Sequence, residues 1–300
     1  MTNRMRLLFT SDLHGEIQLY EELSSLALSV PADLLALGGD VLPSFAPSRR
    51  YKEMIPYQKE FIDQFLFPFL RNTLEAARVK TIFLIPGNWD LGYPFLFREP
   101  VEGLIDLTQK SFFLENGYEL IGYPFVPPTP FRPKEYEKRD DEESVWPPQK
   151  NPSYARSMKR PDQVVPVDPA SYLKGRETIK TDLARLPKAR NPKRAIHVMH
   201  SPPYGSRLDL IQGGGSAGSR SIRTFIEKEQ PLVTLHGHIH ESPEISGSYF
   251  EWIGETLCIN PGQSAWAGKK PVKLDAVLFE IEDPKHTVRH TGRPDQRCFE

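Results

Sequence analysis

The sequence predicts an α/β fold in which a pair of mixed β-sheets is flanked by helices. Short apolar runs alternate with segments of helical spacing, and this alternation is typical of a largely parallel sheet. Most of these runs are continuously apolar, which indicates strands that are covered on both faces. Shorter runs joined by polar turns indicate antiparallel strands in the remaining parts of the chain.

Five apolar runs are the expected parallel strands, and each leads into a side chain of a type that binds metals. Ligand sites in open α/β sheets form beyond the carboxyl ends of the strands. We therefore expect the Asp, Asn and His residues that follow these runs to build one site. The runs are Met5–Thr10, Leu34–Leu37, Thr81–Ile85, Ala195–Met199 and Leu232–Leu235.

Apolar residues at helical spacing predict helices between several of these strands. Pro68 should break or kink one of the helices, because proline removes a backbone donor and clashes with the preceding turn. The predicted helices are Ile17–Leu28, Tyr57–Val79, Ser171–Leu186 and Ser221–Glu229.

The antiparallel strands are predicted from turn signals. Ser111–Leu114 and Tyr118–Tyr123 flank an Asn116-Gly117 pair, which is a strong hairpin turn. Four further short strands with polar turns between them are expected near the C-terminus. They are Phe250–Ile253, Thr256–Ile259, Lys273–Ile281 and Thr287–His290.

Residues 1–300 are expected to form a single domain with an insertion at about 124–169. The insertion is dense in proline and in opposite charges, so we expect no regular element there and little buried core. A solvated or partly disordered segment is one interpretation. The alternative is a lid or partner-contacting arm over the site, for which Phe125, Phe131 and Trp146 offer aromatic anchors.

The composition excludes several classes of function. The chain carries 38 Lys and Arg against 39 Asp and Glu, so a broad basic face for nucleic acid is not expected. No apolar run approaches the length of a membrane span, and the first strand begins too early for a signal peptide. Cys258 and Cys298 fit no disulfide or metal spacing, which favours a reducing compartment. We expect a cytoplasmic protein.

Five motifs follow the predicted parallel strands in a fixed order. They are Asp12-Leu13-His14, Gly39-Asp40, Gly87-Asn88-Trp89-Asp90, His200 and Gly237-His238-Ile239-His240. This order resembles that of the calcineurin-like metallophosphoesterases, and in particular an archaeal and bacterial branch related to small phosphodiesterases. The resemblance extends over residues 5 to 262. It implies a four-layer α/β/β/α sandwich.

The resemblance also implies two divalent metal ions that share one carboxylate. Imidazole and oxygen ligands without thiolate suit manganese, iron, zinc or nickel rather than calcium. Such a pair would supply a bridging hydroxide for in-line attack on a phosphoester, with phosphodiesters favoured. The first ion would be held by Asp12, His14, Asp40 and His240, and the second by Asp40, Asn88, His200 and His238.

Other residues in the motifs are candidates for catalysis or substrate binding, together with Asp40 and Asn88. Trp89 stands where many relatives carry a histidine that serves as general acid, so it either stacks on a base or aryl leaving group or packs beside the loop. His236 could orient a ligand, touch the substrate or supply the missing proton. Asp90 could orient the Asn88 segment or hydrogen-bond a ligand.

A glycine-rich stretch from 213 to 219 precedes a predicted helix. Backbone N–H groups at a helix start bind anions, so Arg220 and Arg223 could add phosphate contacts there. A flexible linker is the competing interpretation.

The expected substrate is a small-molecule or nucleotide phosphoester, and the sequence does not give the oligomeric state. A rival hypothesis is a scaffold that kept the fold and lost catalysis, although none of the seven ligands is missing. A DNA-repair nuclease is less favoured because the chain is not basic. Protein phosphatases carry further Asp and Arg residues after the Gly-Asp motif, and Gly39-Asp40-Val41-Leu42-Pro43 lacks them.

Overall fold

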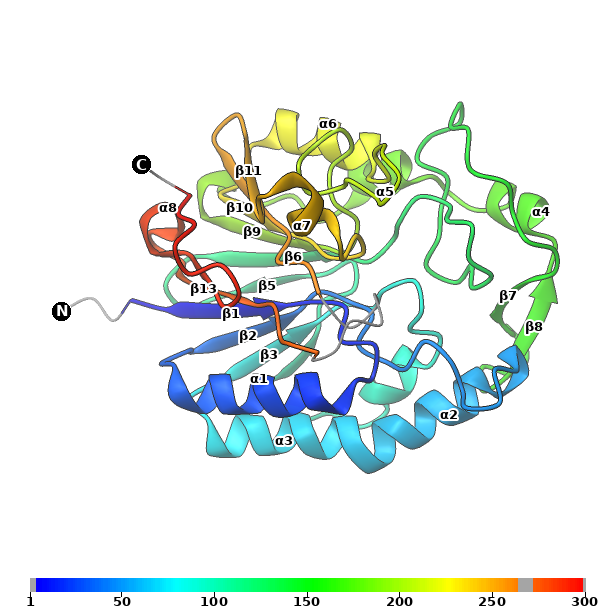
Figure 1. The fold of residues 1–300 in the computed structure, drawn as a ribbon, viewed down its shortest axis with the longest axis horizontal. Helices are drawn as coiled ribbons and strands as arrows, with labels where there is room; N and C mark the ends of the chain where they lie inside the picture. Colours follow the sequence, from blue (N-terminus) through cyan, green and yellow to red (C-terminus); the bar gives the residue numbers. More distant parts are fainter. Residues whose placement is uncertain (1–3, 264–271, 299–300) are drawn as a thin grey trace.

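The computed structural model describes residues 4–263 and 272–298, and these form a four-layer α/β/β/α sandwich (Figure 1). The predicted fold class is confirmed. Within the described residues, each of the two inner layers is a six-stranded sheet. Sheet A has the order β14 (Arg289–His290), β13 (Val277–Glu280), β1 (Arg6–Thr10), β2 (Leu34–Leu37), β3 (Thr81–Leu84), β4 (Leu104–Asp106). Sheet B has the order β11 (Phe250–Ile253), β12 (Thr256–Ile259), β10 (Val233–Leu235), β9 (Ala195–Met199), β6 (Glu119–Tyr123), β5 (Ser111–Phe113).

Both sheets are mixed, with a parallel centre and antiparallel edges. In sheet A, β1 to β4 pair in parallel, whereas β13 is antiparallel to β1 and β14 to β13. In sheet B, the strands from β12 to β6 are parallel, and β11 and β5 are the antiparallel edges. The short strand β4 had no recognisable sequence signal.

Helices cover the outer faces of both sheets. Figure 1 shows α1 and α3 along the outer face of sheet A, and α5 and α6 on the outer side of sheet B. A π-helical segment, Ile62–Leu66, joins α2 to α3. Three 3₁₀ segments cover Tyr51–Glu53, Tyr93–Phe97 and Pro192–Arg194. The helices are α1 (Ile17–Ser29), α2 (Met54–Phe61), α3 (Phe67–Ala76), α4 (Pro169–Lys174), α5 (Ile179–Arg185), α6 (Arg220–Glu229), α7 (Ser242–Ser246) and α8 (Pro284–Thr287).

Two helix predictions need correction. The segment predicted at Ser171–Leu186 is two helices, because α4 ends at Lys174, before Gly175, and the Thr178 side chain caps α5 through the backbone N–H of Thr181. The segment before β3 stays helical from Met54 to Ala76 past Pro68, because the wider π turn Ile62–Leu66 precedes the proline, which lies in the first turn of α3 where its missing N–H is tolerated.

One strand prediction near the C-terminus is also wrong. Residues 284–287 form α8 instead of a polar turn and strand start, because Pro284 suits the first turn of a helix. The strand predicted at Thr287–His290 is therefore reduced to β14. The strand predicted at Lys273–Ile281 is shortened to β13.

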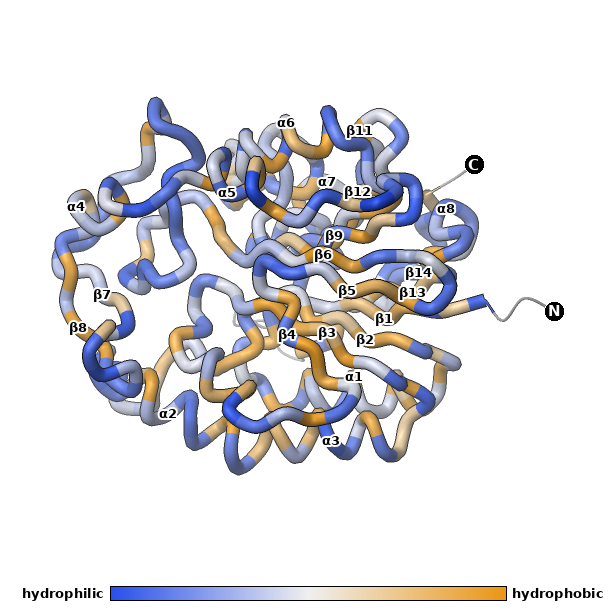
Figure 2. The backbone as a smooth tube through the Cα atoms, turned by 180° about the vertical axis from the view of Figure 1, so that it is seen from behind, coloured by the Kyte–Doolittle hydropathy of each residue, from blue (hydrophilic) through white to orange (hydrophobic). Residues whose placement is uncertain are grey.

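The alternation of side chains along the strands contributes to three of the four apolar cores found among the described residues, and the fourth packs Trp89 against Met54 and Ile55 of α2. In β1, Leu7 and Phe9 face sheet B, whereas Leu8 faces the helices that cover sheet A. On sheet B, Met199 packs with Ile222 of α6 in a third core. Figure 2 shows apolar residues along the strands of both sheets. Strands covered on both faces explain why the sequence runs are continuously apolar.

The insertion differs from the prediction that it carries no regular element and buries little. Strands β7 (Ser153–Arg156) and β8 (Val164–Val167) form a two-stranded sheet within it. Its Lys134 and Glu137 side chains are fully buried and lie 2.7 Å apart, from Nζ to Oε2. Buried ionic and hydrogen-bonded groups thus accompany the buried apolar side chains of Phe125 and Tyr136 here, which is why composition alone was misleading.

Among the described residues, no helix combines the length and the apolar character that crossing a bilayer requires.

Candidate metal centre

The loops after β1, β2, β3, β9 and β10 meet at the carboxyl edge of the two sheets. In sheet A, the Asp12 N–H donates to the Gly39 carbonyl at 2.9 Å and the His14 N–H to the Asp40 carbonyl at 2.8 Å. The Asp12 carboxylate also accepts the N–H of His238, which follows β10, at 3.0 Å. The predicted ligands from both sheets are therefore brought together, as the strand-end argument requires.

Four of the predicted ligands have left-handed backbone conformations. The φ angles are 60° at Asp12, 47° at His14, 50° at Asp40 and 67° at His238. This region is sparsely populated by residues other than glycine, and such outliers persist only where the surroundings fix them. These strained conformations indicate that the surrounding structure fixes the backbone so that the four side chains face one site.

The side chains form two clusters around Asp40. Asp12, His14 and His240 make up the first, and Asp40, His200 and His238 the second, with the ligand atoms of each cluster within 4.8 Å of one another. Asp40 Oδ2 lies 3.9 Å from His14 Nε2 in the first cluster and 3.5 Å from His200 Nε2 in the second. One carboxylate oxygen is thus close to both groups.

Asn88 adds an amide beside the second cluster. It is buried, and neither its Oδ1 nor its Nδ2 has a hydrogen-bond partner among the described residues. The same holds for His200 Nε2. Because buried polar atoms are nearly always paired, unpaired atoms beside two acidic groups fit a site for a cation.

Neighbouring groups fix the orientation of two imidazoles. His200 Nδ1 donates to the Gly38 carbonyl at 2.8 Å, which leaves its Nε2 to face Asp40. Ser44 Oγ lies 2.6 Å from His14 Nδ1 and orients that ring. Sequence reasoning missed Ser44, whose only signal is its place four residues after Asp40 in the same loop.

The Asp90 carboxylate holds the loops that carry Asp40 and Asn88. It accepts the backbone N–H groups of Leu42 at 2.8 Å, Gly87 at 2.9 Å and Val41 at 3.1 Å. Burial raises the pKa of Asp90 to about 8. The side chain thus positions the Asn88 segment and lies behind the predicted ligands.

The pKa values of the residues in the two clusters fit a site that binds a cation. Burial lowers the pKa of His14 to about 4 and that of His238 to about 3, so both rings are neutral at pH 7. At His200, burial lowers the pKa, but Asp40 overcomes this and raises it to about 9. Burial likewise opposes ionisation of Asp12, yet His240 keeps its pKa below the ordinary value. A bound cation would release the proton of His200, since metal ligands must be deprotonated.

His236 is not among the residues that line the cavity, so it is not placed to donate a proton to a substrate there. Its Nδ1 donates to the carbonyl oxygens of Ser201 at 2.9 Å and Met199 at 3.1 Å, and its Nε2 lies 2.8 Å from Thr234 Oγ1. Burial lowers its pKa to about 4. The ring therefore braces the loop that carries His200, which is the orienting role among the predicted alternatives.

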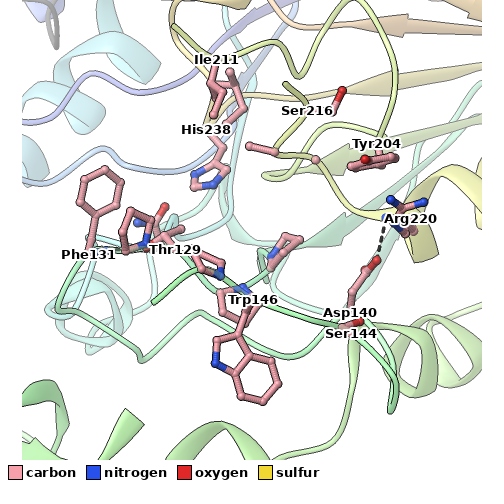
Figure 3. A pocket seen from close by; sticks show the side chains of 18 of the residues that line it. Thr129, Phe131, Asp140, Ser144, Trp146, Tyr204, Ile211, Ser216, Arg220 and His238 are labelled. Carbon is pink, nitrogen blue, oxygen red and sulfur yellow. Dashed lines mark hydrogen bonds between the residues drawn. The ribbon is translucent and has the colours of Figure 1, made fainter. Parts of the chain in front are cut away.

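A cavity of about 880 Å³ opens over the clusters (Figure 3). Asp40, Asn88 and His238 line one side of it. Trp89 also lines the cavity, but it is only 3% exposed, and its ring lies 4.9 Å from that of Phe45, between centroids. The indole is thus packed beside the loop, as one of the two alternatives states, and it also forms part of the cavity wall; its stacking on a leaving group stays a prediction.

The start of α6 after the glycine-rich stretch is not open to an anion in the way that the phosphate-site prediction requires. The carboxylate of Asp140 occupies the start of α6, where it accepts the backbone N–H of Arg220 at 2.7 Å and the Oγ–H of Ser219. Arg223 donates to the carbonyls of Tyr204 and Gly205 and pairs with a residue one turn further along its helix. It does not line the cavity, whereas Arg220 does.

Comparison with known proteins agrees with this geometry. A family model described as calcineurin-like phosphoesterase matches residues 5–242, and the chain belongs to this family. The two clusters are the kind of metal site that is typical of it. No curated protein matches the sequence significantly.

Two solved structures share the fold over almost the whole chain. One is 18% identical, covers 96% of this chain and 98% of its own, and gives a TM-score of 0.59. The other, TT1561 of Thermus thermophilus, is 19% identical with the same coverage and a TM-score of 0.53. At these identities the likeness concerns the fold alone.

Proposed function

We propose that the protein is a dinuclear metal-dependent phosphoesterase that prefers small-molecule or nucleotide phosphodiesters. The observation that carries the proposal is the position of Asp40 Oδ2, within 4 Å of imidazole nitrogens from both clusters. A carboxylate shared in this way is what two neighbouring cations need. The buried, unpaired amide of Asn88 is a further ligand for the second cluster.

The proposed ligand sets divide between the two clusters. The first ion would be held by Asp12, His14, Asp40 and His240, and the second by Asp40, Asn88, His200 and His238. When bound, two such ions lower the pKa of a water that serves as nucleophile and neutralise the phosphate oxygens. The donor set suits manganese, iron, zinc or nickel.

The charge of the cavity favours diesters over monoesters. Among its lining residues in the described chain, Arg220 is the one Lys or Arg. A monoester brings up to two negative charges to this site, whereas a diester brings one. A diester also has a second ester group to fill a space of about 880 Å³.

Neither Trp89 nor His236, the two positions considered for a general acid, can donate a proton to the leaving group. Trp89 occupies the position next to Asn88, and an indole cannot act as a general acid, while His236 has both ring nitrogens bonded within the protein. A general acid contributes about 10²–10⁴ in rate. The proposal therefore predicts a preference for good leaving groups, such as aryl alcohols of low pKa.

The test is a rate comparison with bis(p-nitrophenyl) phosphate, p-nitrophenyl phosphate and a cyclic nucleotide, with added Mn²⁺ and after chelation. We expect the diester to be hydrolysed fastest and only with metal. Asp40→Asn should abolish turnover, whereas Asp162→Asn, an exposed carboxylate in the insertion, should leave it unchanged. Turnover that survives exhaustive chelation, or an active Asp40→Asn variant, would refute the proposal.

A further inference from the structure

The wall of the cavity opposite the metal ligands comes mainly from the insertion. It is built from prolines and aromatic rings, namely Pro127, Pro128, Pro130, Phe131, Trp146 and Pro147. Figure 3 shows Phe131 and Trp146 around the same space as His238, with Tyr204 and Arg220 on another side. The part of the cavity away from the ligands is therefore largely apolar and aromatic.

This wall is held in place by buried polar contacts. Asp140, which is 5% exposed, joins the insertion to the start of α6 through the backbone N–H groups of Arg220 and Ser221. Figure 3 draws the contact between Asp140 and Arg220 as a dashed line. Nearer the metal ligands, the Phe131 ring lies 5.4 Å from that of Trp89, between centroids. The aromatic surface thus begins beside Asn88 and is already formed by the folded chain.

The charges around the same wall are mostly negative. Among the described residues, Asp141, Glu143 and Glu241 line the cavity together with a single arginine, Arg220. The guanidinium of Arg220 lies 3.7 Å above the Tyr204 ring, which holds it at the side of the cavity. A substrate group with further negative charge would meet these carboxylates in a partly enclosed space.

We propose that the insertion selects phosphodiesters that carry an aromatic, uncharged ester group, and that Trp146 is the residue that determines this specificity. The inference rests on the proposed phosphodiesterase function and deepens it. The ester group lies against the wall of Trp146, Phe131 and the prolines, while the phosphate faces the metal ligands. Substrates with additional phosphates or carboxylates on this group are disfavoured by Glu143 and its neighbours.

The experiment measures binding of two diesters to the Mn²⁺-loaded protein by titration calorimetry. Diphenyl phosphate has the flat groups that the wall should bind, and dimethyl phosphate has the same charge without them. Trp146→Ala should weaken diphenyl phosphate about tenfold or more, because stacking on one aromatic side chain contributes about that much. Dimethyl phosphate should change less than about twofold.

Matched control variants test whether the changes in affinity are specific to the aromatic wall of the cavity. Met158→Ala removes a side chain of the insertion that is 99% exposed and lies outside the cavity lining, and it should leave both affinities unchanged. Bis(4-carboxyphenyl) phosphate should bind more weakly than diphenyl phosphate, and Glu143→Gln should narrow that gap. Glu142→Gln changes an adjacent exposed carboxylate outside the cavity lining, and it should leave the difference in affinity between the two diesters unchanged. Thermal melting confirms that each variant is folded.

The outcomes distinguish the inference from the proposed function. If Trp146→Ala weakens both diesters equally, or neither, the inference is overturned while the phosphodiesterase proposal stands on its turnover assay. If the wild-type protein binds diphenyl phosphate no better than dimethyl phosphate, the inference is overturned as well. Selective loss of diphenyl phosphate supports it, and absence of turnover by the same protein would count against the proposed function alone.

Discussion

Replacing Lys134 by methionine should destabilise the insertion by leaving a buried carboxylate without its cation. Lys134 Nζ donates to Glu137 Oε2 at 2.7 Å and to the carbonyl oxygens of Thr129 at 2.9 Å and Phe131 at 2.5 Å. Both charged side chains are fully buried. Methionine has a similar length, so the change removes the charge and the donors with little loss of volume.

The expected loss in free energy of unfolding is about 3–5 kcal/mol, the usual cost of removing one partner of a buried ion pair. Burial raises the pKa of Glu137 to about 7 even with Lys134 present. Without the lysine the folded-state pKa should rise further. The folded state then holds a proton that the unfolded chain releases above its ordinary value of 4.5, so the stability of the variant should fall as the pH is raised through 7.

Urea unfolding at pH 6 and pH 9 measures both effects. Lys159→Met, an exposed lysine in the same insertion, is the control and should change stability by less than about 0.5 kcal/mol. Adding Glu137→Gln to Lys134→Met should recover part of the loss, because the unpaired charge is removed. A Lys134→Met variant as stable as the control at pH 9 would refute the view that this pair holds the insertion.

Three further predictions concern the site and the layers around it. Ser44→Ala removes the hydroxyl that orients His14 and should lower Mn²⁺ affinity about 10–100-fold, measured by calorimetry; unchanged affinity contradicts that role. Burial lowers the pKa of His197 to about 3, so wild-type stability should fall as pH drops below about 6.5, whereas His197→Phe should be less pH-dependent. Parallel pH profiles of unfolding for the two proteins would contradict this. Asp90→Ala leaves three buried N–H groups without an acceptor and should cost about 2–4 kcal/mol in urea unfolding, while a loss below about 1 kcal/mol would argue against its positioning role.

The parallel core of the fold was predictable because its signal is local and repeated. A continuously apolar run such as Leu34–Leu37 reflects burial on both faces, and a ligand directly after it falls at the sheet edge. β4 was missed because Leu104–Asp106 is only three residues long and has one buried position. The division of Ser171–Leu186 depended on a cap at Thr178 that an apolar pattern does not reveal.

The residues that could hold metal were predictable, whereas those that shape the cavity were not. His236 looked like a site residue because it precedes His238 by two positions, yet its ring turns to the carbonyls of Met199 and Ser201. Asp140 gave no signal at all, because its partners at the start of α6 lie about eighty residues away in sequence. Such long-range polar contacts depend on the folded chain and leave no spacing pattern to read.

The most direct test of the central claim is the number of metal ions bound per chain, measured by elemental analysis after loading with Mn²⁺. Two ions per chain are predicted for the wild-type protein. His200→Ala should lose the ion of the second cluster, and Asp40→Asn should lower the occupancy of both, since Asp40 lies between the clusters. A single ion per chain in the wild type, or two retained by Asp40→Asn, would contradict a shared carboxylate.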